Sequence, residues 1–185
     1  IARLYEISGA SCLSVLTDTD FFSGSPDDLI EARSATALPV LRKDFTVDSR
    51  DICDARIMGA DCVLLIVAAL DDAELKDLLS LTKELNMDAL VETHDEGEVE
   101  RALNAGAEMI GVNQRDLVTF EVDQERALRV VQEIPQSIIR VAESGIRSID
   151  DAKALAEAGY IAVLVGEAFV TSEDPSSLIS AFQGL

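Results

Sequence analysis

The sequence has no tryptophan, a single histidine (His94), and only 4% aromatic residues among its 185 positions. One histidine excludes a histidine-rich metal site, and no metal is expected. No apolar run reaches the roughly 18 residues that a membrane-spanning helix needs, so a membrane is not expected as a partner. Hydrophobic residues nevertheless make up 48% of the chain. This balance is typical of a globular protein with a sizeable core.

Basic residues are also scarce. Fifteen lysines and arginines face 35 aspartates and glutamates, which gives a net charge of −20. Such a charge argues against nucleic acid and anionic membranes as partners. The acids cluster in amphipathic stretches such as 71–79 and 95–103, where we expect them on the solvent faces of helices. An anionic substrate would therefore need positive charge that is concentrated locally.

The three cysteines, Cys12, Cys53 and Cys62, match no disulfide or zinc spacing. They are expected to be small buried residues of a protein in a reducing compartment, the cytoplasm.

Short apolar runs alternate with amphipathic stretches along the whole chain, and the starts of the runs lie 21 to 29 residues apart. That spacing fits one strand, one helix and two short loops. The runs are rich in β-branched residues and nearly continuous in apolar character, as in strands buried on both faces. They are CLSVLTD from Cys12, VLRKDF from Val40, CVLLIVA from Cys62, DALVETH from Asp88, MIGVNQR from Met109, IIRVAES from Ile138 and AVLVGEAF from Ala162.

The joints between these runs carry helix-end signals. A glycine that would end a helix in the left-handed conformation lies three residues before four of the runs, at Gly9, Gly59, Gly106 and Gly159. Helix starts are indicated by Ser25-Pro26, by Ser148 with Asp151, and by Asp174-Pro175.

Strict alternation of strands and helices predicts an α/β fold with parallel strands. An open doubly wound sheet and a closed barrel both fit, and the lack of a glycine-rich dinucleotide fingerprint weakens the first. A (β/α)₈ TIM barrel needs eight units, whereas seven are visible. We therefore expect residues 1–185 to form a single, incomplete TIM-barrel domain that lacks its first strand. Its strands would be the second to the eighth, after the end of a first helix at 1–9.

Function in such a barrel is expected at the carboxyl ends of the strands, and polar groups collect there after apolar stems. Alternation places Lys43 on one strand face with Phe45, and Asn113 on one face with Arg115. A lysine and the carboxylate of Glu92 held together can serve as proton donor and acceptor. Simple salt bridges at the strand ends are the alternative explanation.

The last two strand ends have a further interpretation. Loops after the seventh and eighth strands of these barrels commonly bind phosphate through backbone N–H groups. Ser144-Gly145 and Gly166-Glu167 fall at these places. They predict a phosphate site, although each could also be a plain turn.

Several motifs in combination resemble indole-3-glycerol phosphate synthase, from near Ala10 to the C-terminus. They are SVLTDTDFFSGS, PVLRKDF, GADCVLLI, LVETH, GVNQRDLVTF, VAESGI and VLVGEAF. The resemblance implies ring closure of 1-(2-carboxyphenylamino)-1-deoxyribulose 5-phosphate in tryptophan biosynthesis, with loss of carbon dioxide and water and without cofactor or metal. Gln114 departs from the family pattern, which usually has asparagine there. The family's first strand, which supplies a glutamate and a lysine, is not among these residues.

The resemblance also implies roles for individual residues. Lys43 would be the general acid and Glu92 the general base, while Asn113 and Arg115 would orient the substrate. The remaining implied residues line the substrate and phosphate site or contact the aromatic ring: Glu143, Ser144, Gly145, Gly166, Glu167, Phe45 and Leu65.

Two other functions stay open at this point. One is a non-catalytic, truncated barrel that only binds phosphate. The other is a related phosphate-binding enzyme such as phosphoribosylanthranilate isomerase. Fusion or association with other enzymes of the tryptophan pathway is a further expectation, and an in-frame strand encoded upstream of Ile1 is expected for the synthase.

Overall fold

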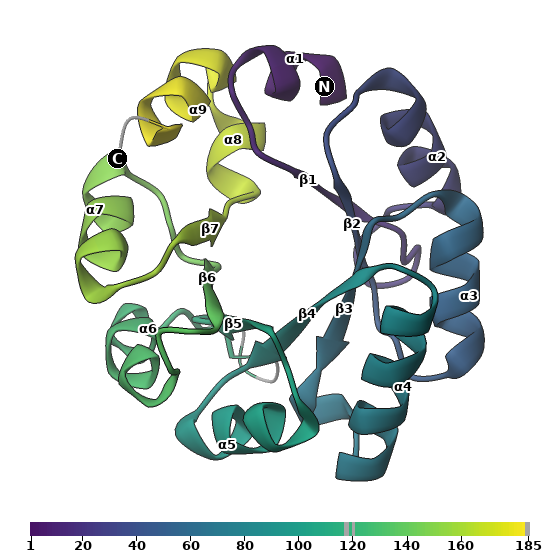
Figure 1. The fold of residues 1–185 in the computed structure, drawn as a ribbon. Coiled ribbons are helices and arrows are strands. Elements are labelled where there is room, and N and C mark those ends of the chain that lie inside the picture. Colours follow the sequence, from purple (N-terminus) through teal and green to yellow (C-terminus); the bar gives the residue numbers. More distant parts are fainter. Residues whose placement is uncertain (117–118, 120, 184–185) are drawn as a thin grey trace. The chain divides into compact units, whose positions relative to one another are not determined.

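A computed structural model describes residues 1–116, 119 and 121–183 of the chain. They fall into two compact units, one within Ile1–Leu90 and the other within Val91–Leu185. In both units strands alternate with helices, as Figure 1 shows. That residues 1–185 form a single domain stays a prediction.

The first unit begins with a helix and places a helix after each of its strands. Helices α2 and α3 contact each other, as do α3 and α4. Its elements are α1 (Ala2–Ile7), β1 (Leu13–Leu16), α2 (Pro26–Ala35), β2 (Val40–Lys43), α3 (Ser49–Met58), β3 (Cys62–Ile66), the 3₁₀ turn η1 (Val67–Ala69) and α4 (Asp72–Glu84).

The second unit continues the alternation. Strand β4 begins in the first unit and ends in the second. None of the helices that the structure describes is both long and apolar enough to cross a membrane. The elements are β4 (Asp88–Thr93), α5 (Glu96–Ala105), β5 (Met109–Asn113), α6 (Gln124–Val130), η2 (Val131–Glu133), β6 (Ile139–Glu143), α7 (Ile149–Ala158), β7 (Ala162–Leu164), α8 (Glu167–Thr171) and α9 (Pro175–Gln183).

Neighbouring strands are parallel and follow the chain order, β1-β2-β3-β4 in the first unit and β4-β5-β6-β7 in the second. The register pairs Leu16 with Lys43 in the first unit and Asn113 with Glu143 in the second. Each strand begins within one residue of the start of its predicted apolar run. The predicted α/β class with parallel strands is therefore confirmed.

The strands in the middle of this order are buried along most of their length. In β3 and β5 every residue after the first is buried. The prediction of strands buried on both faces is wrong for β1 and β7, where Leu16 is 39% exposed and no residue of β7 is buried. β1 stands at one end of the order in the first unit and β7 at one end of the order in the second, and the printed register pairs them with β2 and β6.

The helix-end signals are confirmed. All four predicted glycines have positive φ angles between 93° and 106°. The Ser25 side chain accepts from the N–H of Asp28, and Ser148 with Asp151 forms a capping box. These local contacts explain why helix and strand boundaries were readable from the sequence.

The expectation that the cysteines are buried is wrong for two of them. Cys12 and Cys53 are exposed, while Cys62 is half-buried, and all three are free thiols. Cys53 follows the buried Ile52 on α3, and the helical turn carries the next position away from the core. Cys12 precedes β1 and lies outside the apolar stem of that strand.

Gly106→Ala is predicted to lower the free energy of unfolding by about 1–2 kcal/mol, the cost of a left-handed conformation for a residue with a Cβ. Gly106 has a φ of 93°, and a Cβ there would meet no atom within 4 Å, so the backbone cost is isolated. Gly97→Ala on the same helix is the control and should cost less, because its φ is not positive. Urea denaturation measures both. Equal losses would contradict the prediction.

Stability is also predicted to fall as the pH rises above about 10, the ordinary value for tyrosine. The Tyr160 side chain is buried, and its hydroxyl donates to the carbonyl of Ala127 at 2.8 Å. Burial raises the pKa of Tyr160, so the unfolded chain releases this proton at a lower pH than the folded chain. Tyr160→Phe should flatten the alkaline fall in urea-derived stability. An unchanged slope would contradict this account.

Candidate active site

Lys43 is the last residue of β2 and is half-buried. Its two neighbours on the opposite strand face, Arg42 and Asp44, are buried and form an ion pair with 2.7 Å between Nη2 and Oδ2. Arg42 also donates to the Thr17 hydroxyl at 3.1 Å and to the backbone carbonyl of Asp51 on α3 at 2.8 Å. These contacts hold Arg42 and Asp44 toward the helix layer. Alternation then directs Lys43 to the other face of the strand, as predicted.

Further hydrogen bonds fix both members of the Arg42–Asp44 pair. Thr17, at the end of β1, donates its hydroxyl to the Asp44 carboxylate. The other Asp44 oxygen accepts from the Phe45 N–H at 2.8 Å. A buried ion pair offsets its desolvation cost only when further hydrogen bonds satisfy both groups, and that condition is met here.

Phe45 lies within an aromatic cluster that follows β1 and β2. The rings of Phe22 and Phe45 are stacked with centroids 5.5 Å apart, and Phe21 meets Phe45 edge-on at the same distance. Phe21 is 76% exposed and Phe22 is 40% exposed. The first unit thus presents an apolar aromatic surface two residues beyond Lys43.

Glu92 is the predicted base, and its side chain near the end of β4 is 1% exposed. His94 follows two residues later, and its Nε2 lies 3.5 Å from Oε1 of Glu92. The other ring nitrogen, Nδ1, lies 3.0 Å from Oε2 of Glu98. Thr93, between Glu92 and His94, is buried and donates its hydroxyl to the Gly111 carbonyl of β5.

The structure brings Asn113, Arg115 and Glu167 together in the second unit. Asn113 is buried at the end of β5, and its side-chain oxygen accepts from the N–H of Arg115 at 3.0 Å. The Arg115 guanidinium lies 3.4 Å from the carboxylate of Glu167, in the first turn of α8. Arg115 and Glu167 are partly exposed, so this ion pair contributes little to stability.

The turn after β6 contains two predicted residues in left-handed conformations, Ser144 with φ 63° and Gly145 with φ 69°. Gln114 donates to the Ser144 carbonyl at 2.7 Å, and Gln124 donates to the Gly145 carbonyl at 3.1 Å. A Cβ at Gly145 would lie 2.4 Å from Val122, so glycine is required there by packing as well as by φ. The Gln114 side chain thus supports this turn from the strand position next to Asn113.

Glu143 ends β6 with a side chain that is among the most deeply buried of the described residues. Its Cα is in register with that of Asn113, and its carbonyl accepts from the N–H of Gln114 at 3.0 Å. Gly166 caps α8, and a Cβ there would meet no atom within 4 Å. Each predicted residue of the second unit therefore lies at a strand end or directly after one.

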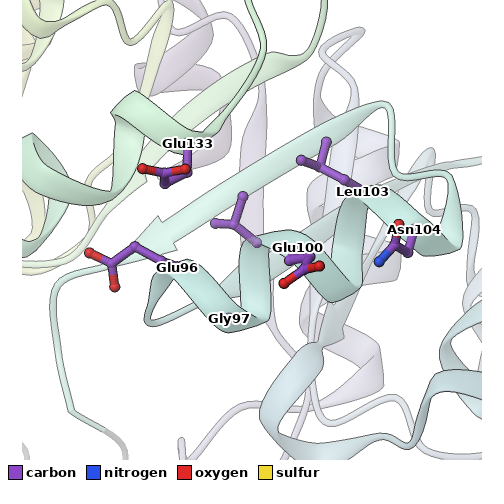
Figure 2. Close-up of a pocket in the computed structure, with 7 residues that line it drawn as sticks. Glu96, Gly97, Glu100, Leu103, Asn104 and Glu133 are labelled. Atoms are coloured by element: carbon purple, nitrogen blue, oxygen red, sulfur yellow. The ribbon is translucent and has the colours of Figure 1, made fainter.

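A surface pocket of about 390 Å³ lies along α5 and η2, and three of its lining residues are Glu96, Glu100 and Glu133. Figure 2 shows these side chains on and beside α5. None of the predicted site residues lines it. Its acidic rim is also unsuited to a phosphorylated substrate.

Sequence reasoning missed two groups of residues. It treated His94 only as an argument against a metal site, although the i, i+2 spacing from Glu92 places both on one strand face. It also passed over Phe21 and Phe22, which were signalled by an aromatic pair directly after a strand end. Among the described residues, no group of three or more histidine, cysteine, aspartate or glutamate side chains is arranged to hold a metal ion.

Solved structures with the same fold share little sequence with the chain. The N-acetylmannosamine-6-phosphate 2-epimerase from Clostridium perfringens matches 90% of this chain and 78% of its own, with a TM-score of 0.72 and 15% identity. The structure described as KGPDC from Streptococcus mutans matches 99% of this chain and 89% of its own, with a TM-score of 0.75 and 15% identity. Fold and strand-end chemistry together define an α/β protein of the TIM-barrel class.

Sequence comparison places the chain within that class. The family model for indole-3-glycerol phosphate synthase matches residues 1–182, and the chain belongs to this family. The synthase of Polaromonas sp. (strain JS666) is 51% identical over 185 residues, which are 100% of this chain and 70% of that protein. The synthase of Mycolicibacterium vanbaalenii is 53% identical over 180 residues, 97% of this chain and 66% of that protein. The chain is thus a lyase-type enzyme of tryptophan biosynthesis that acts on a small phosphorylated substrate.

Arg42→Ala is predicted to lower the free energy of unfolding by about 3–5 kcal/mol, because it leaves the buried Asp44 carboxylate without its cation. Arg50→Ala is the control. It also removes an ion pair, to Asp48, but the Arg50 side chain is 84% exposed, so water can solvate the carboxylate that is left. The double variant Arg42→Met/Asp44→Leu should lose less than Arg42→Ala. Urea denaturation of all three measures the losses, and an Arg42→Ala loss no larger than that of Arg50→Ala would contradict the account.

Proposed function

We propose that Lys43 and Glu92 are the general acid and the general base of indole ring closure. The substrate is 1-(2-carboxyphenylamino)-1-deoxyribulose 5-phosphate, and the products are indole-3-glycerol phosphate, carbon dioxide and water. The ring carbon that bears the carboxylate attacks the ketone carbon, carbon dioxide leaves, and the former ketone oxygen departs as water. The observation that carries the proposal is a lysine and a buried carboxylate at strand ends of a chain that matches the synthase family over residues 1–182.

Lys43 suits the role of acid for two reasons. The ketone oxygen gains negative charge when the new carbon–carbon bond forms, so a cation with a transferable proton stabilises that step. The Arg42–Asp44 pair anchors the strand on both sides of Lys43, which limits the positions that its Cα can take. A fixed donor contributes more than a mobile one because its orientation is settled before the reaction.

Glu92 suits the role of base in the dehydration step. It must remove a proton from carbon when the hydroxyl group leaves, and a carboxylate acts at hydrogen-bond distance. The apolar stem of β4 and the burial of Glu92 keep solvent from competing for that contact. Asn113 and Arg115 would orient the substrate, with Glu143 and Ser144 as further contacts.

The phosphate group would bind at the turn after β6 and at the start of α8, through Gly145, Gly166 and Glu167. These turns follow the seventh and eighth strands in the numbering of the full barrel, where phosphate sites commonly lie. Gly166 supports the proposal, because its backbone is open to an approaching group. Glu167 would contribute its backbone N–H, since its carboxylate is anionic and lies beside Arg115.

The carboxyphenyl ring of the substrate would pack against the aromatic cluster of the first unit. Phe45 was predicted for this contact, and the stacked Phe22 extends the same apolar surface. Partly exposed aromatic side chains gain contact area when they cover an aromatic ligand. A contact between Leu65 and the ring stays a prediction, as do a cytoplasmic location and association or fusion with other enzymes of the pathway.

Lys43→Ala is predicted to reduce kcat by at least about 10²-fold, the lower range for general acid–base catalysis. The control is Lys76→Ala, which removes an exposed lysine of α4 and should leave the rate unchanged. Turnover is followed by the absorbance of the indole product, and circular dichroism checks that both variants are folded. A folded Lys43→Ala variant with the parent rate would refute the role of Lys43.

The substrate is tested by comparing two related compounds in the same preparation. We expect turnover of 1-(2-carboxyphenylamino)-1-deoxyribulose 5-phosphate and none of phosphoribosylanthranilate. The reverse result would identify an isomerase. Phosphate-ester binding without turnover of either compound would identify a non-catalytic barrel.

A further inference from the structure

His94 lies between two carboxylates, one of which is the proposed base. Its Nε2 lies 3.5 Å from Oε1 of Glu92, and its Nδ1 lies 3.0 Å from Oε2 of Glu98. The same Glu98 oxygen accepts from the backbone N–H of His94 at 2.7 Å. The His94 and Glu98 side chains are only 12% and 16% exposed, so solvent screens these contacts weakly. One carboxylate oxygen of Glu98 thus contacts both the ring and the backbone N–H of His94.

The first turn of α5 shares one contact with two other helices and adds a second. In α3, α4 and α7 the acidic residue at the third helical position accepts from the N-cap backbone N–H, which completes a capping box. In α3 and α7 that acid also accepts from the N–H of the residue before the N-cap. Glu98 occupies the same position in α5 and likewise accepts from the N–H of His94, the residue before the N-cap. In α5 the Glu98 carboxylate also lies 3.0 Å from the ring of that residue.

We propose that His94 is a positioning residue that holds the Glu92 carboxylate in place, with its own ring fixed by Glu98. The proposal deepens the function proposed above and rests on Glu92 as the base. A carboxylate has several rotamers, and a general base works only in those that reach the substrate proton. A ring anchored on α5 restricts the choice.

The chemistry of the ring fits this task. When Nδ1 carries a proton, it donates to Glu98 at 3.0 Å, and Nε2 then faces Glu92. A ring that carries a proton on both nitrogens can donate Nε2–H to one oxygen of the Glu92 carboxylate. The same N–H can still donate to that oxygen after the other carboxylate oxygen has accepted the substrate proton, so no proton has to leave the ring. The pair can therefore keep its contact before and after Glu92 accepts a proton, and the separation of 3.5 Å is of the kind that tightens when substrate binds.

Two carboxylates of the second unit face the ring. Glu92 lies on β4 and Glu98 on α5. Nε2 is near the first and Nδ1 is near the second.

The test compares single and double variants of the enzyme. His94→Ala should lower kcat by about 10- to 100-fold, a part of the contribution of a general base, and change KM little. Glu98→Gln should lower kcat by less. Because His94 acts through Glu92, the double variant Glu92→Gln/His94→Ala should be no slower than Glu92→Gln alone. A purely structural role would instead give losses that add.

Two further variants serve as rescue and control. His94→Gln should recover part of the lost kcat, because its amide nitrogen can still donate to Glu92. Glu100→Gln neutralises an exposed acid on the same helix and should leave kcat and KM unchanged. Thermal unfolding followed by circular dichroism identifies any variant that is not folded. If His94→Ala is not folded, the positioning role is tested by the kcat of Glu98→Gln and by comparing Glu92→Gln/His94→Gln with the two single variants.

Each outcome is informative. If Glu92→Gln is inactive and folded His94→Ala has the parent kcat, the positioning role is refuted and the proposed function stands. If the losses add in the double variant, the positioning role is also refuted. If Glu92→Gln retains the parent rate, the proposed role of Glu92 fails instead. A non-additive loss with rescue by glutamine supports the positioning role.

Discussion

Side chains that alternate across a parallel strand constrain every part of the candidate site. At the end of β2, Arg42 and Asp44 are bound toward the helix layer, and Lys43 between them takes the opposite face. At the end of β4, Thr93 donates to β5, while Glu92 and His94 on either side share the other face. One residue of each strand end anchors the backbone, and the adjacent residue, on the opposite face, is the one proposed to carry chemistry.

The anchors matter because charged groups beside a buried strand are costly unless their hydrogen bonds are complete. Arg42 meets this need with a carboxylate, a hydroxyl and a backbone carbonyl. Uncharged polar groups of the second unit are bonded as well. The Asn113 side-chain oxygen accepts from the N–H of Arg115, and two glutamine amides donate to the carbonyls of Ser144 and Gly145. The positive φ of Ser144 is maintained by its surroundings, to which the Gln114 amide contributes a hydrogen bond.

The fold was predictable from the sequence to within about one residue at the strand starts, because strand burial and helix caps are local signals. Ser25 and Ser148 cap helices through contacts only three residues away. Site residues were predictable as strand-end positions for the same reason. The pairing of Arg115 with Glu167 was not, since 52 residues separate them and no local pattern records the contact. Exposure of Cys12 and Cys53 was missed because a cysteine fits either environment.

The sequence by itself determined the alternation of strands and helices, the left-handed glycines, and the places where Lys43, Glu92 and Asn113 fall, because each depends on spacing along the chain. Tertiary structure decided which partners these places meet. Gly145 is required because Val122 packs against it, and His94 is held because the Glu98 carboxylate contacts both its backbone N–H and its ring. These contacts depend on how closely neighbouring strands and helices approach one another. The spacing of residues along the chain does not give the distance between such elements.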